Sequence, residues 1–367
     1  MIKKPRVENT SRILRSLWIS KSISRIEIAR ELGLNKSTIT DIVSQLIEQG
    51  IVLETKEGSS SPLGGRKPVQ LELNKKYGYV LGIELTSDRY TIVAVDLAGD
   101  ILFSKTEEDT LITKNFEERI VRILKKYPPE LEWIGAPVIG AGIGMSGIIN
   151  TKTGVIQGSI ALKIENDYDF ANIIGSQFDF PVFVENDANS CAWGELAFHR
   201  SEKLRNFIFT LVEFNPTRSK ELYENVSVGF GIVFGGHVYY GNGYSAGEFH
   251  SIFCNPEDLG QFRISSQDVK LDDDGDKLRE FIKELSKHLA LFTNTFNLGQ
   301  IFLGGDIEQY QDIARPILTK AIKENWMYKS PIDCEIRFSS LANKSVAYGA
   351  AGMVLERLFE VPESISQ

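Results

Sequence analysis

One short segment of the chain gathers side chains that can contact DNA. Residues 36–44 read KSTITDIVS, and a helix would present on its outer face one cation and four small hydroxylated side chains: Lys36, Ser37, Thr38, Thr40 and Ser44. A lysine can neutralise a phosphate, and short hydroxylated side chains let a helix approach base edges closely. The segment therefore has the composition of a recognition helix.

The residues around this segment predict a helix-turn-helix. Ser24 and Glu27 form a capping-box pattern that begins a short helix, and Gly33 ends it. Asn35 is suited to cap the next helix, in which apolar residues recur at helical spacing as far as Gly50. Two short helices joined by a glycine-containing turn are typical of helix-turn-helix domains.

A β-hairpin is expected next. Residues 51–58 and 69–74 have the pattern of strands, and the loop between them carries Arg66 and Lys67 near its end. An arginine on such a loop can enter the minor groove of DNA, where the negative potential is strongest. The alternative is a helical protein-interaction module with a solvated loop. Because helices, hairpin and charge agree, we expect residues 1–76 to form a winged helix-turn-helix domain that binds DNA.

The charge is distributed unevenly along the chain. Residues 1–76 contain 8 Lys and 6 Arg against 1 Asp and 7 Glu, which is a net charge of +6. Since the whole chain has a net charge of −8, residues 77–367 carry −14. A basic N-terminal segment joined to an acidic remainder indicates that the N-terminal segment binds a polyanion. The chain has three widely spaced cysteines and an N-terminus without an apolar core. We therefore expect a cytoplasmic protein without a disulfide framework or a membrane segment.

The remaining residues predict an α/β protein of two similar lobes, because a strand hairpin opens each half and alternating helices and strands follow. The first hairpin, residues 79–95, contains a tight turn at Leu85, Thr86, Ser87 and Asp88. A phosphate-binding turn at such a place should be rich in glycine, because backbone N–H groups must approach the phosphate oxygens. This turn has no glycine.

The chain resembles the ROK family (repressors, open reading frames and sugar kinases) over essentially its whole length. The resemblance rests on VENDAN at 184–189, GIGMSGII at 142–149 and SAGEF at 245–249. The winged-helix front and the loop sequence GGRKP resemble the repressor branch, whereas the family's sugar kinases usually lack this front.

The resemblance implies an actin-like ATPase fold, which is ribonuclease H-like in each lobe. The winged helix would occupy residues 1–76 and the first lobe residues 77–184. A C-terminal helix at 344–360 would return to the first lobe. Residues 185–343 would form the second lobe, with the sugar site and an assembly surface.

The resemblance also implies a sugar site made of Gly147, Asn186, Asp187, Glu248 and His250. Asn186 would bind sugar hydroxyls, and in a kinase Asp187 would be the catalytic base that takes a hydroxyl proton. His250 stands one position before the family's histidine, whose place is taken by Ser251. The alternative is that Asn186 and Asp187 only cap the following helix, since both residue types do this well.

The nucleotide motifs of the family are altered in this chain. Glu84–Asp88 replaces D-x-G-G-T, and Asp88 would bring a carboxylate toward phosphate; two unit charges about 4 Å apart repel by roughly 4 kcal/mol at an effective dielectric near 20. In the second motif Val228 replaces a threonine. The nucleotide-binding glycines that remain are Gly229, Gly231, Gly304 and Gly305. This pattern argues against ATP turnover.

The zinc motif of the family is also missing. The family has a C-x-C-G-x-x-G-C-x-E run, whereas this chain has SIFCNPEDLGQF with Cys254 alone. Zinc needs about four ligands, so we expect no structural zinc, no other metal and no cofactor.

The sequence thus favours a sugar-responsive transcription regulator, a repressor of carbohydrate genes that binds palindromic operator DNA as a homodimer or higher homo-oligomer. Two alternatives stay open. One is an ATP-dependent sugar kinase with an N-terminal DNA-binding extension. The other is a DNA-binding protein without a small-molecule effector, in which the lobes serve only for assembly.

Overall fold

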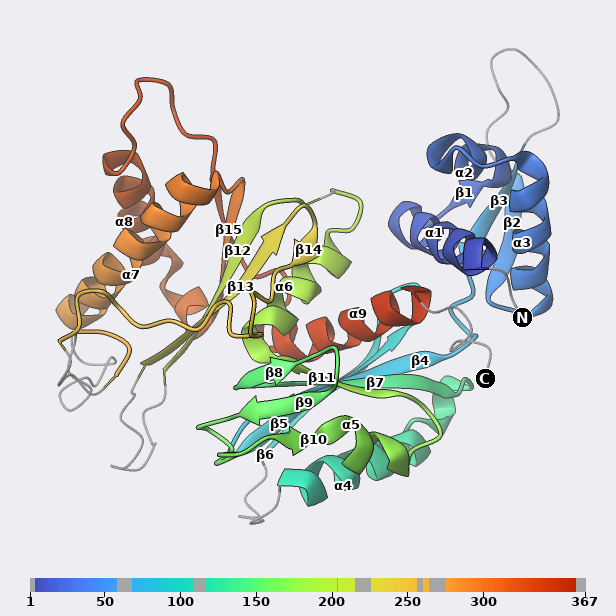
Figure 1. The fold of residues 1–367 in the computed structure, drawn as a ribbon, viewed down its shortest axis with the longest axis horizontal. Coiled ribbons are helices and arrows are strands. Elements are labelled where there is room, and N and C mark those ends of the chain that lie inside the picture. The colour runs from blue at the N-terminus through green and yellow to red at the C-terminus, as the bar shows by residue number, and fades with distance from the viewer. Residues whose placement is uncertain are drawn as a thin grey trace.

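The computed structural model describes residues 4–57, 68–108, 116–202, 204–214, 226–255, 260–263 and 275–360. Three parts can be followed in Figure 1: a small domain at the N-terminus, a sheet built from strands β4 to β7 and β11, and a second sheet built from β12 to β16. The expected mixed α/β architecture is confirmed. No helix within the described ranges is long and apolar enough to cross a bilayer.

The N-terminal domain contains three helices and a three-stranded antiparallel sheet in the order β1-β3-β2. Its elements are α1 (Lys4–Ser20), β1 (Ile23–Ser24), α2 (Arg25–Leu32), α3 (Lys36–Glu48), β2 (Val52–Glu57) and β3 (Val69–Leu73). Apolar side chains from all three helices and from the sheet close one core. Helix-turn-helix and β-hairpin are combined as in a winged helix.

The turn between α2 and α3 is fixed by its capping residues. The capping box of Ser24 and Glu27 is confirmed, and it holds the pKa of Glu27 below its usual value through hydrogen bonds from Ser24. Gly33 ends α2 in the left-handed conformation at φ +65°. Asn35 is the N-cap residue of α3, but its side chain makes no capping hydrogen bond, so the cap expected there is wrong in that detail.

The first lobe has a five-stranded sheet in the order β11-β7-β4-β5-β6. β4, β7 and β11 run parallel, whereas β4, β5 and β6 form an antiparallel meander. A second small sheet has the order β10-β9-β8. The elements are β4 (Tyr79–Leu85), β5 (Arg89–Asp96), β6 (Ile101–Glu108), α4 (Phe116–Glu130), β7 (Val138–Met145), β8 (Ile148–Asn150), β9 (Val155–Gly158), β10 (Tyr168–Asp169), α5 (Phe170–Ile173) and β11 (Val182–Asn186).

The second lobe repeats this plan, with a sheet in the order β14-β13-β12-β15-β16. Here β12, β15 and β16 are parallel, and β13 and β14 are antiparallel to their neighbours. The elements are α6 (Asp187–Phe198), β12 (Phe207–Phe214), β13 (Val226–Phe234), β14 (His237–Val238), α7 (Gly275–Phe296), β15 (Gln300–Gly305), α8 (Gln311–Glu324), β16 (Glu335–Phe338) and α9 (Ser345–Glu360). Each sheet therefore has three strands in meander order followed by two parallel ones.

Helices α6 and α9 join the two lobes. α9 packs on β4 and β7 of the first sheet, and α6 packs on β12 and β13 of the second (Figure 1). The two helices touch so closely that a Cβ on Gly349 would lie 1.6 Å from the carbonyl oxygen of Ser190. No side chain fits there, so only glycine can occupy position 349. A change in the relative position of the lobes must pass through this helix pair.

Candidate effector site and DNA interface

The described part of the N-terminal domain presents α3 to solvent. Ile39, Ile42, Val43 and Leu46 are buried in the domain core. Opposite them, Lys36, Ser37 and Thr40 are exposed, while Thr38 and Ser44 are partly exposed. The Thr40 hydroxyl donates to the carbonyl oxygen of Lys36 at 2.9 Å and keeps its lone pairs free for an external donor. The structure thus places the five predicted DNA-contacting residues of α3 on accessible positions.

Two contacts fix the angle of α3 against α1. Arg6 donates one hydrogen bond to Asp41 at 3.0 Å and another to Gln45 at 2.8 Å. Both partners lie on the exposed part of α3, so Arg6 holds the helix without covering its first turn. Arg66 and Lys67, the predicted wing contacts, lie outside the described residues.

The predicted sugar residues Asn186 and Gly147 lie together at the end of β11. The Asn186 amide donates to the carbonyl oxygen of Gly147 at 3.0 Å, and its own oxygen accepts from the backbone N–H of Asn189 at 3.0 Å. Asn186 is therefore the N-cap of α6, as the capping alternative expected. An amide has two N–H groups and two lone pairs, so one donor and one acceptor remain for a ligand.

Asp187 follows Asn186 and belongs to a group of carboxylates that we call the acidic cluster: Glu84, Asp187, Glu213, Glu248 and Asp306. Burial, followed by repulsion from Glu213 and then from Glu248 and Glu84, raises the pKa of Asp187 to about 7. Burial and the charge of Glu213 likewise raise the pKa of Glu84 to about 7. A carboxyl group whose pKa lies near 7 can accept a proton from a hydroxyl, as a general base does.

Three members of the acidic cluster lie at or near the ends of strands in the two sheets. Glu84 is the second-last residue of β4, Glu213 is the second-last residue of β12, and Asp306 follows β15. Carboxylates gathered here repel the phosphates of ATP. Because Glu84 stands where the family's motif has an aspartate, the expected lack of ATP turnover still rests on Asp88 and the missing glycines, and it stays a prediction.

The turn between β4 and β5 is closed by its own hydrogen bonds. The Thr86 hydroxyl donates to Asp88 at 3.0 Å, and the backbone N–H of Arg89 donates to the Thr86 hydroxyl at 3.2 Å. The Arg119 side chain donates to the Thr86 carbonyl oxygen at 2.9 Å. None of the four turn residues has a positive φ. The turn is a compact polar hairpin whose shape differs from that of a glycine-lined phosphate cradle.

The four candidate nucleotide-binding glycines are all tightly packed. A Cβ on Gly231 would lie 2.3 Å from the carbonyl oxygen of Ala188, and one on Gly305 would lie 2.2 Å from that of Val212. For Gly304 the nearest atom would be in the Phe209 ring at 2.4 Å, and for Gly229 it would be the Ala188 Cβ at 3.1 Å. Close packing within the second lobe is enough to require small residues at these positions.

Glu248 and His250 are both exposed and lie in the segment after β14, ten and twelve residues beyond its end. The next residue, Ser251, is buried and has a different role. Its hydroxyl hydrogen-bonds to Glu284 and lies 3.0 Å from Nε2 of His288, and both of these side chains come from α7. This polar contact ties the segment after Glu248 to α7. Across the described ranges, no three metal-ligating side chains come together.

A buried network beneath Asn186 was missed by the sequence analysis. Glu185 is fully buried and accepts hydrogen bonds from the backbone N–H of Asn186 at 2.8 Å and from the Tyr240 hydroxyl at 2.7 Å. Trp193 donates its indole N–H to the same Tyr240 oxygen at 3.1 Å. Burial raises the pKa of Glu185 to about 7, and the Tyr240 hydrogen bond opposes the rise. The only feature of the local sequence that could have indicated this network is the acid Glu185 within the predicted strand, directly before Asn186.

Helix α6 runs from this site to the winged-helix domain. Its last turn leads into Arg200, which donates to the Trp18 carbonyl oxygen of α1 at 2.8 Å and to the Ala98 carbonyl oxygen at 2.7 Å. The guanidinium also lies 4.2 Å from the Trp18 ring centroid. Arg15 of α1 forms an ion pair with Glu356 of α9. The winged-helix domain is therefore attached to both helices that join the lobes.

Comparison with known proteins agrees with this architecture. Residues 80–260 match the ROK family, and residues 8–57 match the MarR family. The xylose repressor of Bacillus spizizenii is 25% identical over 388 residues, covering 96% of each chain. The DNA-binding transcriptional dual regulator NagC of Escherichia coli is 22% identical and covers 94% of this chain and 92% of its own.

Solved structures show the same fold. A ROK family transcriptional regulator described as a homologue of the E. coli MLC protein superposes with a TM-score of 0.78 at 20% identity, over 99% of this chain and 100% of its own. A ROK family glucokinase from Streptomyces griseus, solved with glucose and AMPPNP, reaches a TM-score of 0.57 at 18% identity, over 75% of this chain and 99% of its own. The kinase matches only part of this chain, whereas the regulator matches nearly all of it. The chain thus contains a ROK family domain, matched over residues 80–260, behind an N-terminal winged-helix domain matched by the MarR family.

Proposed function

We propose that the protein is a sugar-responsive DNA-binding transcription regulator that represses carbohydrate-utilisation genes. The observation that carries the proposal is the position of α6. The helix begins at Asn186, where a sugar would bind, and the segment after its end hydrogen-bonds to Trp18 of the winged-helix domain. The whole-length similarity to a xylose repressor supports the same function.

The sugar would bind where Asn186, Asp187 and Gly147 meet. Asn186 retains one N–H and one lone pair for a hydroxyl, and the Asp187 carboxylate can accept two hydroxyl hydrogen bonds. Glu248 adds a further acceptor from the exposed segment after β14. A ligand that binds one arrangement of the lobes more tightly shifts the protein toward that arrangement.

DNA binding would use the exposed residues of α3 together with Arg66 and Lys67. A homodimer would place its two α3 helices in successive major grooves of a palindrome, with half-site centres about 34–36 Å apart or a multiple of it. The sugar would act by changing how the two winged helices are spaced. The two lobes would then serve as the effector domain, which binds the sugar but does not transfer phosphate.

The DNA part of the proposal is tested by the salt dependence of binding. Lys36→Ala and Arg66→Ala should each weaken binding and lower the slope of log affinity against log salt by about 1, because each removes about one phosphate contact. Lys323→Ala, an exposed lysine on α8, is the matched control and should change neither quantity. If both Lys36→Ala and Arg66→Ala kept the native DNA affinity and salt dependence, neither α3 nor the loop that carries Arg66 would belong to the DNA interface.

A further inference from the structure

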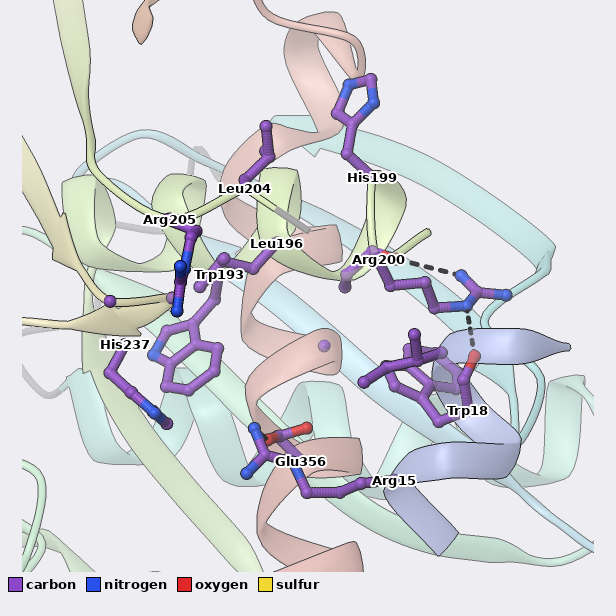
Figure 2. A pocket seen from close by; sticks show the side chains of 15 residues that line it. Arg15, Trp18, Trp193, Leu196, His199, Arg200, Leu204, Arg205, His237 and Glu356 are labelled. Carbon is purple, nitrogen blue, oxygen red and sulfur yellow. Dashed lines mark hydrogen bonds and ion pairs between the residues drawn. The ribbon is translucent and has the colours of Figure 1, made fainter. Parts of the chain in front are cut away.

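A cavity lies at the junction between the winged-helix domain and the second lobe (Figure 2), and Asn186 is not among the residues that line it. Its volume is about 230 Å³. The walls come from α1, α6, the segment after α6, the β13–β14 turn and α9, and include Arg15, Trp18, Trp193, Arg205, His237 and Glu356. No residue of the acidic cluster lines it.

Two of the cationic groups around the cavity are already occupied. Arg15 is paired with Glu356. Arg200 donates to three carbonyl oxygens, those of Trp18, Ala98 and Ala197. These two arginines therefore hold the walls of the cavity in place and have little capacity left for a ligand.

Arg205 and His237 differ from them. Within the described ranges, neither side chain has a hydrogen-bonded or ionic partner, although both line the cavity. The backbone N–H of Gly236 donates to the Arg205 carbonyl oxygen at 2.8 Å, which holds the two residues on one wall. Figure 2 shows their side chains on either side of the Trp193 ring. A guanidinium and an imidazole placed in this way present N–H donors to an anion.

The wall between these donors is apolar. Trp193 is fixed by its indole N–H bond to Tyr240, and Leu196 and Leu204 line the cavity with it. The site thus combines a flat apolar surface with two donors at its edge. Small-molecule sites are typically apolar with a few polar groups that fix orientation.

We propose that this junction cavity binds a small organic anion that has a ring-sized apolar body. The anionic group is held by Arg205 and His237, and the body lies against Trp193. Since the walls belong to both the winged-helix domain and the lobes, occupancy depends on their relative position. Binding of the anion is therefore coupled to the affinity for DNA. The site is separate from the proposed sugar site and goes beyond the sugar response.

The test uses the full chain without DNA and phenyl phosphate as the probe in isothermal titration calorimetry. One saturable site is expected. Inorganic phosphate, which lacks the ring, and phenol, which lacks the charge, should each bind at least about tenfold more weakly. Absence of saturable binding at millimolar phenyl phosphate would contradict the proposal, and equal binding of inorganic phosphate would contradict the role of Trp193.

Variants locate the site. Arg205→Gln and His237→Gln should each weaken phenyl phosphate binding, the former about tenfold, while thermal unfolding stays unchanged because both side chains are exposed. Arg279→Gln, an exposed arginine on α7, is the matched control and should bind as the native chain does. Binding that is unaffected in both cavity variants would overturn the assignment. Because no DNA is present, this outcome is independent of the proposed regulatory function.

Discussion

Arg200 binds Trp18 in two ways at once, through a 2.8 Å hydrogen bond from its Nε to the Trp18 carbonyl oxygen and through its guanidinium, which lies 4.2 Å from the centroid of the indole ring. Arg200 follows the end of α6, and Trp18 is near the end of α1. The contact joins the helix that begins at Asn186 to the domain that carries α3. A rotation of α6 would therefore displace Trp18 and with it the winged-helix domain.

Replacing Arg200 by alanine should loosen this junction. Three carbonyl oxygens lose a charged donor and the Trp18 ring loses its cover, so the free energy of unfolding should fall by about 2–3 kcal/mol. Denaturant unfolding of the full chain measures this, with Arg279→Ala as an exposed control. An unfolding midpoint equal to that of the native chain would show that the contact contributes nothing.

Asn186 variants separate its capping role from its proposed sugar role. Asn186→Ala removes the cap of α6 and should cost about 1 kcal/mol of stability. Asn186→Ser keeps a capping oxygen but loses the N–H that reaches Gly147, so its stability should stay near the native value.

The sugar-induced rise in melting temperature then reports the second role. We expect it to disappear in both variants. A full thermal shift in Asn186→Ser would mean that Asn186 is a helix cap and nothing more.

The acidic cluster should make the native chain less stable as the pH rises from 5 to 8. The pKa of Asp187 is raised from 3.8 to about 7, so between these values the folded chain holds a proton that the unfolded chain has released. The corresponding stability, at most about 4 kcal/mol, is lost progressively as the pH rises from 3.8 to about 7, so at most about 3 kcal/mol of it is lost above pH 5. His199 acts in the same direction, because Glu195 and Glu202 raise its pKa and its contribution is lost at high pH.

Asp187→Asn isolates the aspartate, since the amide does not ionise. The fall in the free energy of unfolding between pH 5 and pH 8 should be smaller in this variant than in the native chain. Denaturant melts at the two pH values provide the comparison. Identical pH dependence in the two proteins would mean that Asp187 titrates at its ordinary value.

Magnesium ATP should bind weakly and should not be turned over with a panel of hexoses. The β4–β5 turn, where the family's motif has two glycines, is filled by its own hydrogen bonds, and the carboxylates of Glu84, Glu213 and Asp306 add negative charge that repels phosphates. A coupled assay for ADP measures turnover. ADP formation that Asp187→Asn abolishes would instead establish the sugar kinase alternative.

Local patterns predicted the parts of the structure that depend on neighbouring residues. Ser24, Glu27 and Gly33 lie within ten positions of each other, and their types determine how α2 begins and ends. The alternating residues 69–74 and the continuous apolar runs within residues 79–95 likewise predicted strands. Asn35 shows the limit of such reasoning, because its type suits a cap but its side chain makes no capping bond.

Contacts between distant residues could not be predicted in this way. Arg200 and Trp18 are 182 positions apart, and Glu185 and Tyr240 are 55 positions apart. Nothing in the sequence near one partner indicates the other. The family resemblance located Asn186 and Asp187, but only the packed lobes bring Glu84, Glu213 and Asp306 toward them.

The most direct test of the account is a selection of genomic DNA fragments by the purified full-length protein, repeated with individual sugars including xylose. We predict that a small set of fragments is retained and that one sugar or sugar derivative changes their retention. Asn186→Ser should retain the same fragments but fail to respond. Retention of no discrete fragments, or of fragments that no sugar in a broad panel affects, would contradict sugar-responsive regulation.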